Sequence, residues 1–90
     1  MNFIVKYESA IAAWVLDHRP TLDDEWAMLS WIIDLQYGDT LPGIIGYSSN
    51  GNRIVSGPHG EAVEMVVEPK PLKFGTDPPY AAICIRRISS

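Results

Sequence analysis

Few side chains in this chain could do chemistry: one cysteine, two histidines and a cluster of three carboxylates. Cys84 lies in the middle of an apolar run, YAAICIRRI. A catalytic thiol needs access to solvent and a pKa lowered by a helix N-terminus or a basic neighbour. Only Arg86, two residues along the same strand, could be that neighbour. We therefore interpret Cys84 as a small buried apolar side chain.

The two histidines do not form a recognisable metal site. His59 stands two residues before Glu61, and this pair lacks the third and fourth ligands that zinc sites need. His18 lies far away in the sequence, near the expected end of a helix. The sequence therefore predicts no metal ion and no cofactor.

The carboxylates Asp23, Asp24 and Glu25 are also poor candidates for general acid–base catalysis. Such a role needs one carboxyl group buried in a cleft with a shifted pKa. A helix N-terminus explains the cluster without a cleft, because carboxylates there interact favourably with the helix dipole. The chain contains neither a GxSxG turn nor a glycine-rich phosphate loop. We predict no catalytic residues and a protein that is not an enzyme; a small enzyme that pairs His59 with Asp39 or Glu64 is the alternative.

The element that carries this cluster is a helix predicted over Thr21–Gly38, TLDDEWAMLSWIIDLQYG. Thr21 can cap its N-terminus, with Asp24 at the third helical position. Pro20 prevents continuation from upstream, and Gly38 suits a left-handed residue after the C-terminus.

This helix has more apolar surface than one core face can absorb. At 100° per residue, one apolar stripe is formed by Leu22, Trp26, Leu29, Ile33 and Tyr37. Met28, Ile32 and Leu35 widen it on one side, and Trp31 lies nearly opposite its centre. Either the helix is central and covered on two sides by its own domain, or the side formed by Met28, Trp31 and Leu35 binds another chain.

The remaining elements are short. Residues 2–7 alternate as a strand, and Ser9–His18 forms a helix that Ser9 caps and Arg19-Pro20 ends. Asn50-Gly51 predicts a two-residue type I′ hairpin turn. Counting outward from that turn places three apolar side chains on the core face of the hairpin: Ile45, Tyr47 and Ile54.

Two further strands complete the expected sheet. In the segment 61–68, Val63, Met65 and Val67 share one face. The near-continuous apolar start of residues 80–88 predicts a central strand with both faces covered. The proline-rich connection 69–79 carries Leu72 and Phe74, which either cap one end of the core or anchor a partner.

The expected order is therefore β-α-α-β-β-β-β in a single domain, residues 1–90. This order predicts an α+β fold, with two short N-terminal helices packed on one face of a mainly antiparallel sheet of four or five strands. Ninety residues suffice for one modest core.

The net charge of −4 is unevenly distributed. Residues 1–42 contain seven acidic and two basic side chains, whereas residues 43–90 contain four acidic and five basic ones. The acidic half argues against binding to nucleic-acid phosphates and favours a basic partner surface. Arg86 and Arg87 near Lys70 and Lys73 are too few to outweigh this. No segment resembles a signal peptide or a membrane span, so we expect a cytoplasmic protein, in its own cell or in the cytoplasm of a host.

These observations predict a small acidic protein-binding module without catalytic activity. We expect an inhibitor or accessory factor of the kind that phages and mobile elements encode, including anti-defence proteins. The partner-binding residues expected from sequence are Met28, Trp31, Leu35, Leu72 and Phe74. The alternative is a homo-oligomer, for example a homodimer, that pairs through the same helix face.

Overall fold

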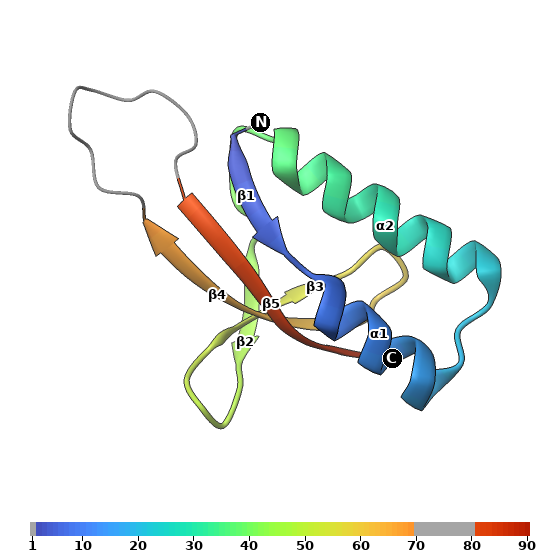
Figure 1. Ribbon diagram of the computed structural model, residues 1–90. Helices are drawn as coiled ribbons and strands as arrows, with labels where there is room; N and C mark the ends of the chain where they lie inside the picture. Colours follow the sequence, from blue (N-terminus) through green and yellow to red (C-terminus); the bar gives the residue numbers. More distant parts are fainter. Residues whose placement is uncertain (1, 70–80) are drawn as a thin grey trace.

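The computed structural model describes residues 2–69 and 81–90 (Figure 1). The elements follow the expected order: β1 (Phe3–Lys6), α1 (Glu8–His18), α2 (Leu22–Tyr37), β2 (Ile44–Tyr47), β3 (Arg53–Ser56), β4 (Ala62–Pro69) and β5 (Ala81–Ser89). The predicted α+β fold is confirmed, because the two helices precede four of the five strands and all five strands form one sheet.

The sheet has the strand order β1-β5-β4-β3-β2. β2, β3, β4 and β5 pair antiparallel in succession. β1 pairs with β5 in parallel, with Phe3 opposite Ala81 and Val5 opposite Ile83. A chain that leaves β1 must cross over the sheet before a parallel neighbour can form, and here α1 and α2 lie within that long connection. β1 stands at one end of the strand order and is an edge strand.

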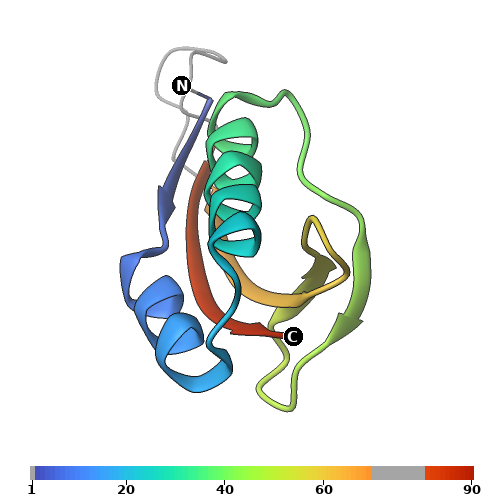
Figure 2. The ribbon, with the colours of Figure 1, turned by 90° about the vertical axis from the view of Figure 1, so that its right-hand side faces the viewer.

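Both helices cover one face of this sheet. In Figure 2, α2 lies between β1 and α1 on one side and the β2–β3 hairpin on the other. Alternate residues of the strands point to one buried cluster, which also receives residues from both helices. Its largest fully buried side chains are Trp14, Met28, Ile32, Met65 and Ile83. The core is thus a single layer between the helices and the sheet.

No described helix covers the opposite face of the sheet, which we call the open face. In β5, Ala81, Ile83 and Ile85 are buried, whereas Ala82 and Cys84 on the other face are only half-buried. The expectation that β5 is covered on both faces is therefore wrong, because both helices pack on the same side. The interpretation of Cys84 as a buried side chain needs the same correction.

The β2–β3 hairpin differs from the expected one by one residue of register. The Gly51 amide donates to the Ser48 carbonyl at 2.9 Å, and the Ser48 amide donates to the Asn52 carbonyl at 2.8 Å. The loop therefore contains three residues, with Gly51 at φ 81°, as in a type I turn followed by a left-handed residue.

This register changes which residues of the two strands share a face. Tyr47 pairs with Arg53 and Gly46 with Ile54. Tyr47 therefore lies on the face of Val55, the buried residue of β3, and Ile54 lies on the other face. Ile45 and Tyr47, which we expected in the core, are 65% and 66% exposed. Ile54 is half-buried on the open face.

The helix ends are also partly different from the prediction. Thr21 caps α2 as expected, since its hydroxyl accepts from the Asp24 amide at 3.2 Å. Ser9 does not cap α1, because that helix begins at Glu8 and its N-cap is Tyr7, which makes no side-chain capping hydrogen bond. Gly38 is extended rather than left-handed, whereas Arg19 after α1 takes the left-handed conformation at φ 45°.

Candidate protein-interaction surface

Helix α2 has two apolar faces, and the structure assigns them in the opposite way to the sequence-based hypothesis. Met28, Ile32 and Leu35 form the inner face, with exposures of 0%, 1% and 6%. Trp31 is partly buried and packs against the same core. The expectation that Met28 and Leu35 lie at the surface is therefore wrong. These side chains face the sheet because Val55, Val63, Met65 and Ile83 offer the apolar surface that covers them.

The other face of α2 is the main exposed apolar surface of the helix. Leu22 is 67% exposed, Trp26 62%, Ile33 54% and Tyr37 60%, and Leu29 among them is half-buried. We call these five residues the outer stripe. Large apolar side chains gathered on one exposed face, rather than scattered singly, are typical of interaction sites.

Two contacts hold the N-terminal end of α2 in place. The Asp24 carboxylate lies 2.9 Å from His59 Nδ1 in the turn between β3 and β4. Met28 packs against the same turn, since a Cβ atom added to Gly57 would lie 3.2 Å from Met28 Cε. The pairing of Asp24 with His59 replaces the pairing with Asp39 or Glu64 considered from sequence.

Asn2 holds the C-terminal end of α2. Its amide N–H donates to the Gln36 carbonyl at 2.8 Å, and its side-chain Nδ2 donates to the Gly38 carbonyl at 3.0 Å and to Asp39 Oδ1 at 3.2 Å. These bonds satisfy carbonyl groups that a helix end leaves unpaired. Both ends of α2 are bonded to distant parts of the chain, so the outer stripe is presented by an anchored helix rather than by a loop.

The outer stripe has acidic neighbours and no basic ones within α2. The helix carries Asp23, Asp24 and Glu25 in its first turn and Asp34 farther along, and no lysine or arginine. Of these four carboxylates only Asp24 has an ion-pair partner in the described part of the chain. The face therefore combines apolar contact area with negative charge.

A cluster of polar side chains lies where the β3–β4 turn meets both helices. Glu61 is 5% exposed, and its Oε1 accepts from the His59 amide at 2.7 Å. Trp14 Nε1 donates to Ser90 Oγ at 2.7 Å. These residues and Asp24 line a depression of about 160 Å³. The Glu61 carboxylate therefore stabilises the turn itself, because it accepts from the backbone amide two residues before it.

Basic side chains gather on the open face of the sheet. Ile85 of β5 lies opposite Met65, but Arg87 lies opposite Glu64, so Arg86 is an extra residue that forms a β-bulge. A bulge can redirect a side chain, and here Arg86 and Arg87 are both exposed. They line one depression together. Neither guanidinium has a hydrogen bond or an ion pair with another described residue.

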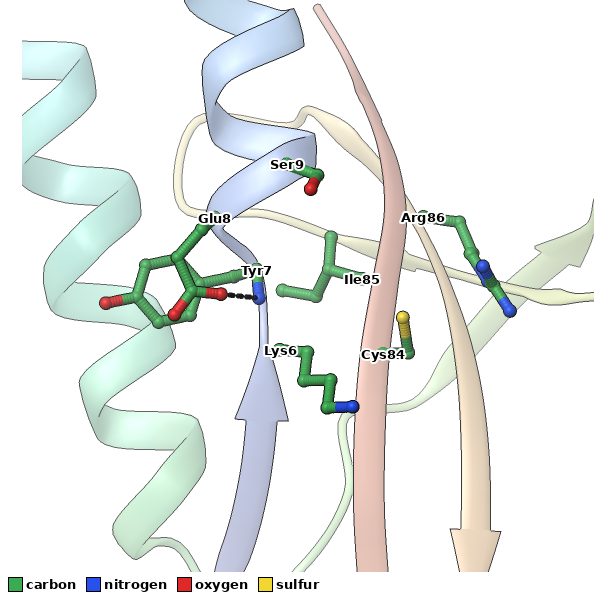
Figure 3. Close-up of a pocket in the computed structure, with 7 residues that line it drawn as sticks. All are labelled: Lys6, Tyr7, Glu8, Ser9, Cys84, Ile85 and Arg86. Carbon is green, nitrogen blue, oxygen red and sulfur yellow. Dashed lines mark hydrogen bonds between the residues drawn. The ribbon is translucent and has the colours of Figure 1, made fainter.

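A second depression beside this basic region lies at the start of α1 (Figure 3). It encloses about 440 Å³ and is lined by Lys6, Tyr7, Glu8, Ser9, Cys84, Ile85 and Arg86. The Tyr7 amide donates to Glu8 Oε2 at 3.1 Å. The backbone amide of Glu8 itself, and then this bond from Tyr7, hold the pKa of the Glu8 carboxyl below its ordinary value of 4.5. The Glu8 carboxylate thus already occupies the helix N-terminus at which an anion would bind.

Within residues 2–69 and 81–90, no cluster of three or more His, Cys, Asp or Glu side chains could hold a metal ion. No helix in the same ranges is long and apolar enough to cross a membrane. Leu72 and Phe74, the two partner-binding residues expected in the connection 69–79, lie outside the described residues.

Sequence reasoning recognised the outer stripe as an apolar stripe but did not identify it as the exposed face. The spacing of Leu22, Trp26, Leu29 and Ile33 is typical of a seam between two helices. The buried residues Met28, Ile32 and Leu35 have the same four-and-three spacing, so no local signal distinguishes the two faces. No family model, curated protein or solved structure matches this chain, so the surface itself carries the functional argument.

Proposed function

We propose that the chain is a non-enzymatic protein-binding module whose contact surface is the outer stripe of α2. The observation that carries the proposal is the exposure of four large apolar side chains on one face of one helix. Trp26 and Tyr37 are among them, and aromatic residues are enriched in interface cores. A role as inhibitor or accessory factor is consistent with a chain that acts by contact alone.

The position of the stripe supports the proposal in a second way. Met28, Ile32 and Leu35 already supply α2 with a complete buried face, so the outer stripe is not needed to attach the helix to the sheet. Exposed apolar area promotes association with other molecules, and folding gains little from these side chains while they stay in water. A partner that buries them accounts for their presence.

Site-specific photo-crosslinking tests the proposal. A photoreactive phenylalanine analogue replaces Trp26 in the full chain, and the same analogue replaces Leu16 as the control, because Leu16 is 76% exposed on α1. In a lysate of the cells that encode the chain, we expect a specific adduct from position 26 and none from position 16. Mass spectrometry then identifies the partner.

Direct binding of the purified partner completes the test. A central interface aromatic contributes about 2 kcal/mol or more, so Trp26→Ala should weaken binding by roughly 30-fold or more. Leu16→Ala should leave it unchanged. Equal crosslinking from both positions, or a Trp26→Ala variant that binds as tightly as wild type, would refute the outer stripe as the contact surface.

A further inference from the structure

We propose that the partner element on the outer stripe is an α-helix whose apolar seam is flanked by lysine or arginine, contributed by a different protein. This inference rests on the protein-binding function proposed above and adds the shape and charge of the partner. It draws on the spacing of the stripe, its acidic flanks and the charge of α2 as a whole.

The spacing of the stripe matches helix-on-helix packing. Leu22, Trp26, Leu29 and Ile33 follow one another at intervals of four, three and four residues. Alternation of these intervals gives the 3.5-residue repeat at which side chains of one helix insert between those of another. The stripe from Leu22 to Tyr37 is about 22 Å long at 1.5 Å per residue, so it can accommodate about two heptads of a partner helix.

The flanks of the stripe specify the charge of the partner. Asp23 and Glu25 lie on opposite sides of the stripe at its N-terminal end, one residue after Leu22 and one before Trp26. In a helix pair these positions face the flanks of the opposing seam, where charge selects the partner. Two carboxylates there favour a partner with basic flanks and disfavour one with acidic flanks.

The same charges exclude two other occupants. A second copy of this chain would bring together two helices with four carboxylates each and no basic side chain, which costs like-charge repulsion in either direction of pairing. A lipid surface attracts amphipathic helices with lysine or arginine on the polar face, and α2 has neither. A basic helix from another protein is the occupant that fits both the apolar and the charged groups.

Two synthetic peptides test the inference against the full-length chain. Both contain about three heptads with leucine at the two seam positions of each heptad. One carries lysine at the flanking positions and the other glutamate. We expect the lysine peptide to bind at least ten-fold more tightly than the glutamate peptide by isothermal titration calorimetry. Raising the salt concentration should reduce that difference, because exposed charges are screened.

Matched variants of the protein locate the binding. Ile33→Asp places a carboxylate in the seam and should abolish binding of the lysine peptide, whereas Leu16→Asp on α1 should preserve it. Circular dichroism of both variants confirms that they are folded. Light scattering of wild-type protein should report a monomer at micromolar concentration.

Each contrary result overturns the inference. One such result is that the two peptides bind equally well, or that neither binds. Another is that the lysine peptide still binds the Ile33→Asp variant, or that wild-type protein forms a dimer that Ile33→Asp dissociates. The photo-crosslink at position 26 separates this failure from failure of the proposed function. If the peptides fail and the crosslink persists, only the helical, basic character of the partner is wrong; if both fail, the outer stripe is not a binding surface.

Discussion

Single residues of α2 differ sharply in what they contribute to folding and to contact. Met28 is fully buried, and Ile33 on the same helix is 54% exposed. Met28→Ala should lower the free energy of unfolding by about 2–5 kcal/mol, because it removes buried methylene groups and leaves a cavity. Ile33→Ala should change it by about 0.5 kcal/mol or less. Urea denaturation of both variants measures the difference.

The same pair of variants tests the assignment of the two faces. A destabilisation by Ile33→Ala as large as that by Met28→Ala would mean that the outer stripe packs within the fold. A chain of this size has a stability of roughly 5–13 kcal/mol, so Met28→Ala could leave little folded protein. If Met28→Ala does not fold, Met28→Leu replaces it in the comparison with Ile33→Ala. This more conservative change should lower the free energy of unfolding by less than about 1.5 kcal/mol.

Glu8 provides a residue-scale test in acid. Its carboxylate accepts from the backbone amides of Glu8 and Tyr7, which together with Lys6 lower its pKa in the folded protein. A lowered folded-state pKa gives a contribution to stability that is complete above the unfolded pKa and is lost as the pH falls through the folded pKa. The stability advantage of wild type over Glu8→Gln should therefore be constant at neutral pH and should shrink as the pH falls below the ordinary value of 4.5.

Denaturation of both proteins across the acid range measures this advantage. Ser9→Ala, an exposed change in the same helical turn, is the control and should give a pH-independent difference from wild type. A difference between wild type and Glu8→Gln that does not vary with pH would contradict the proposed hydrogen bonds.

At the scale of elements, the β2–β3 hairpin gives a prediction that separates the two possible registers. Gly51 has φ 81°, whereas Asn50 is not among the described residues with positive φ. Gly51→Ala should therefore destabilise the protein by about 1–2 kcal/mol, the cost of a left-handed alanine. Asn50→Ala should change the stability by about 0.5 kcal/mol or less, whereas in a two-residue type I′ turn both residues would require positive φ. Thermal and urea denaturation can rank the variants, and an equal cost for both would contradict the three-residue loop.

The hairpin also shows where sequence reasoning reached its limit. Asn50-Gly51 identified the turn correctly, because few dipeptides favour positive φ so strongly. The loop length depends on the hydrogen bonds of Ser48 with Gly51 and Asn52, which the dipeptide does not determine. One residue of register then moved Ile54 from the expected core face to the open face.

Helix α2 shows the same limit at larger scale. Its N-terminus was predictable because Thr21, Pro20 and the acidic first turn are local signals. The choice of the buried face was not, since both faces are apolar and the choice depends on distant residues such as Val63 and Ile83. The C-terminus depends on Asn2, which lies 36 residues away from Gly38 in the sequence. Local signals therefore predicted the elements, and long-range packing decided which surfaces they expose.

At the scale of the whole molecule, the charges are divided between two surfaces. The acids of α2 lie on the covered side of the sheet, beyond the core, and Arg86 and Arg87 lie on its open side. Because α2 has no basic side chain, self-association through the outer stripe is opposed by charge, and the purified chain should be a monomer.

Charge reversal should remove that opposition. A variant with Asp23→Lys and Glu25→Lys carries basic flanks on an otherwise unchanged stripe, so it supplies the type of helix that wild type should bind. Mixed with wild type, it should form a heterodimer, detected by analytical ultracentrifugation with one of the two proteins labelled. Each protein alone should contain a smaller fraction of dimer than the mixture, because like charges face one another in a homodimer.

The control for this experiment reverses two acids that do not flank the stripe. Glu64 and Glu68 lie on β4, so Glu64→Lys with Glu68→Lys changes the net charge by the same amount without touching α2. This variant should not form a complex with wild type through the stripe, and adding Ile33→Asp to the first variant should dissolve its heterodimer. Equal association of both charge-reversed variants with wild type would show that net charge, rather than the outer stripe of α2, brings the molecules together.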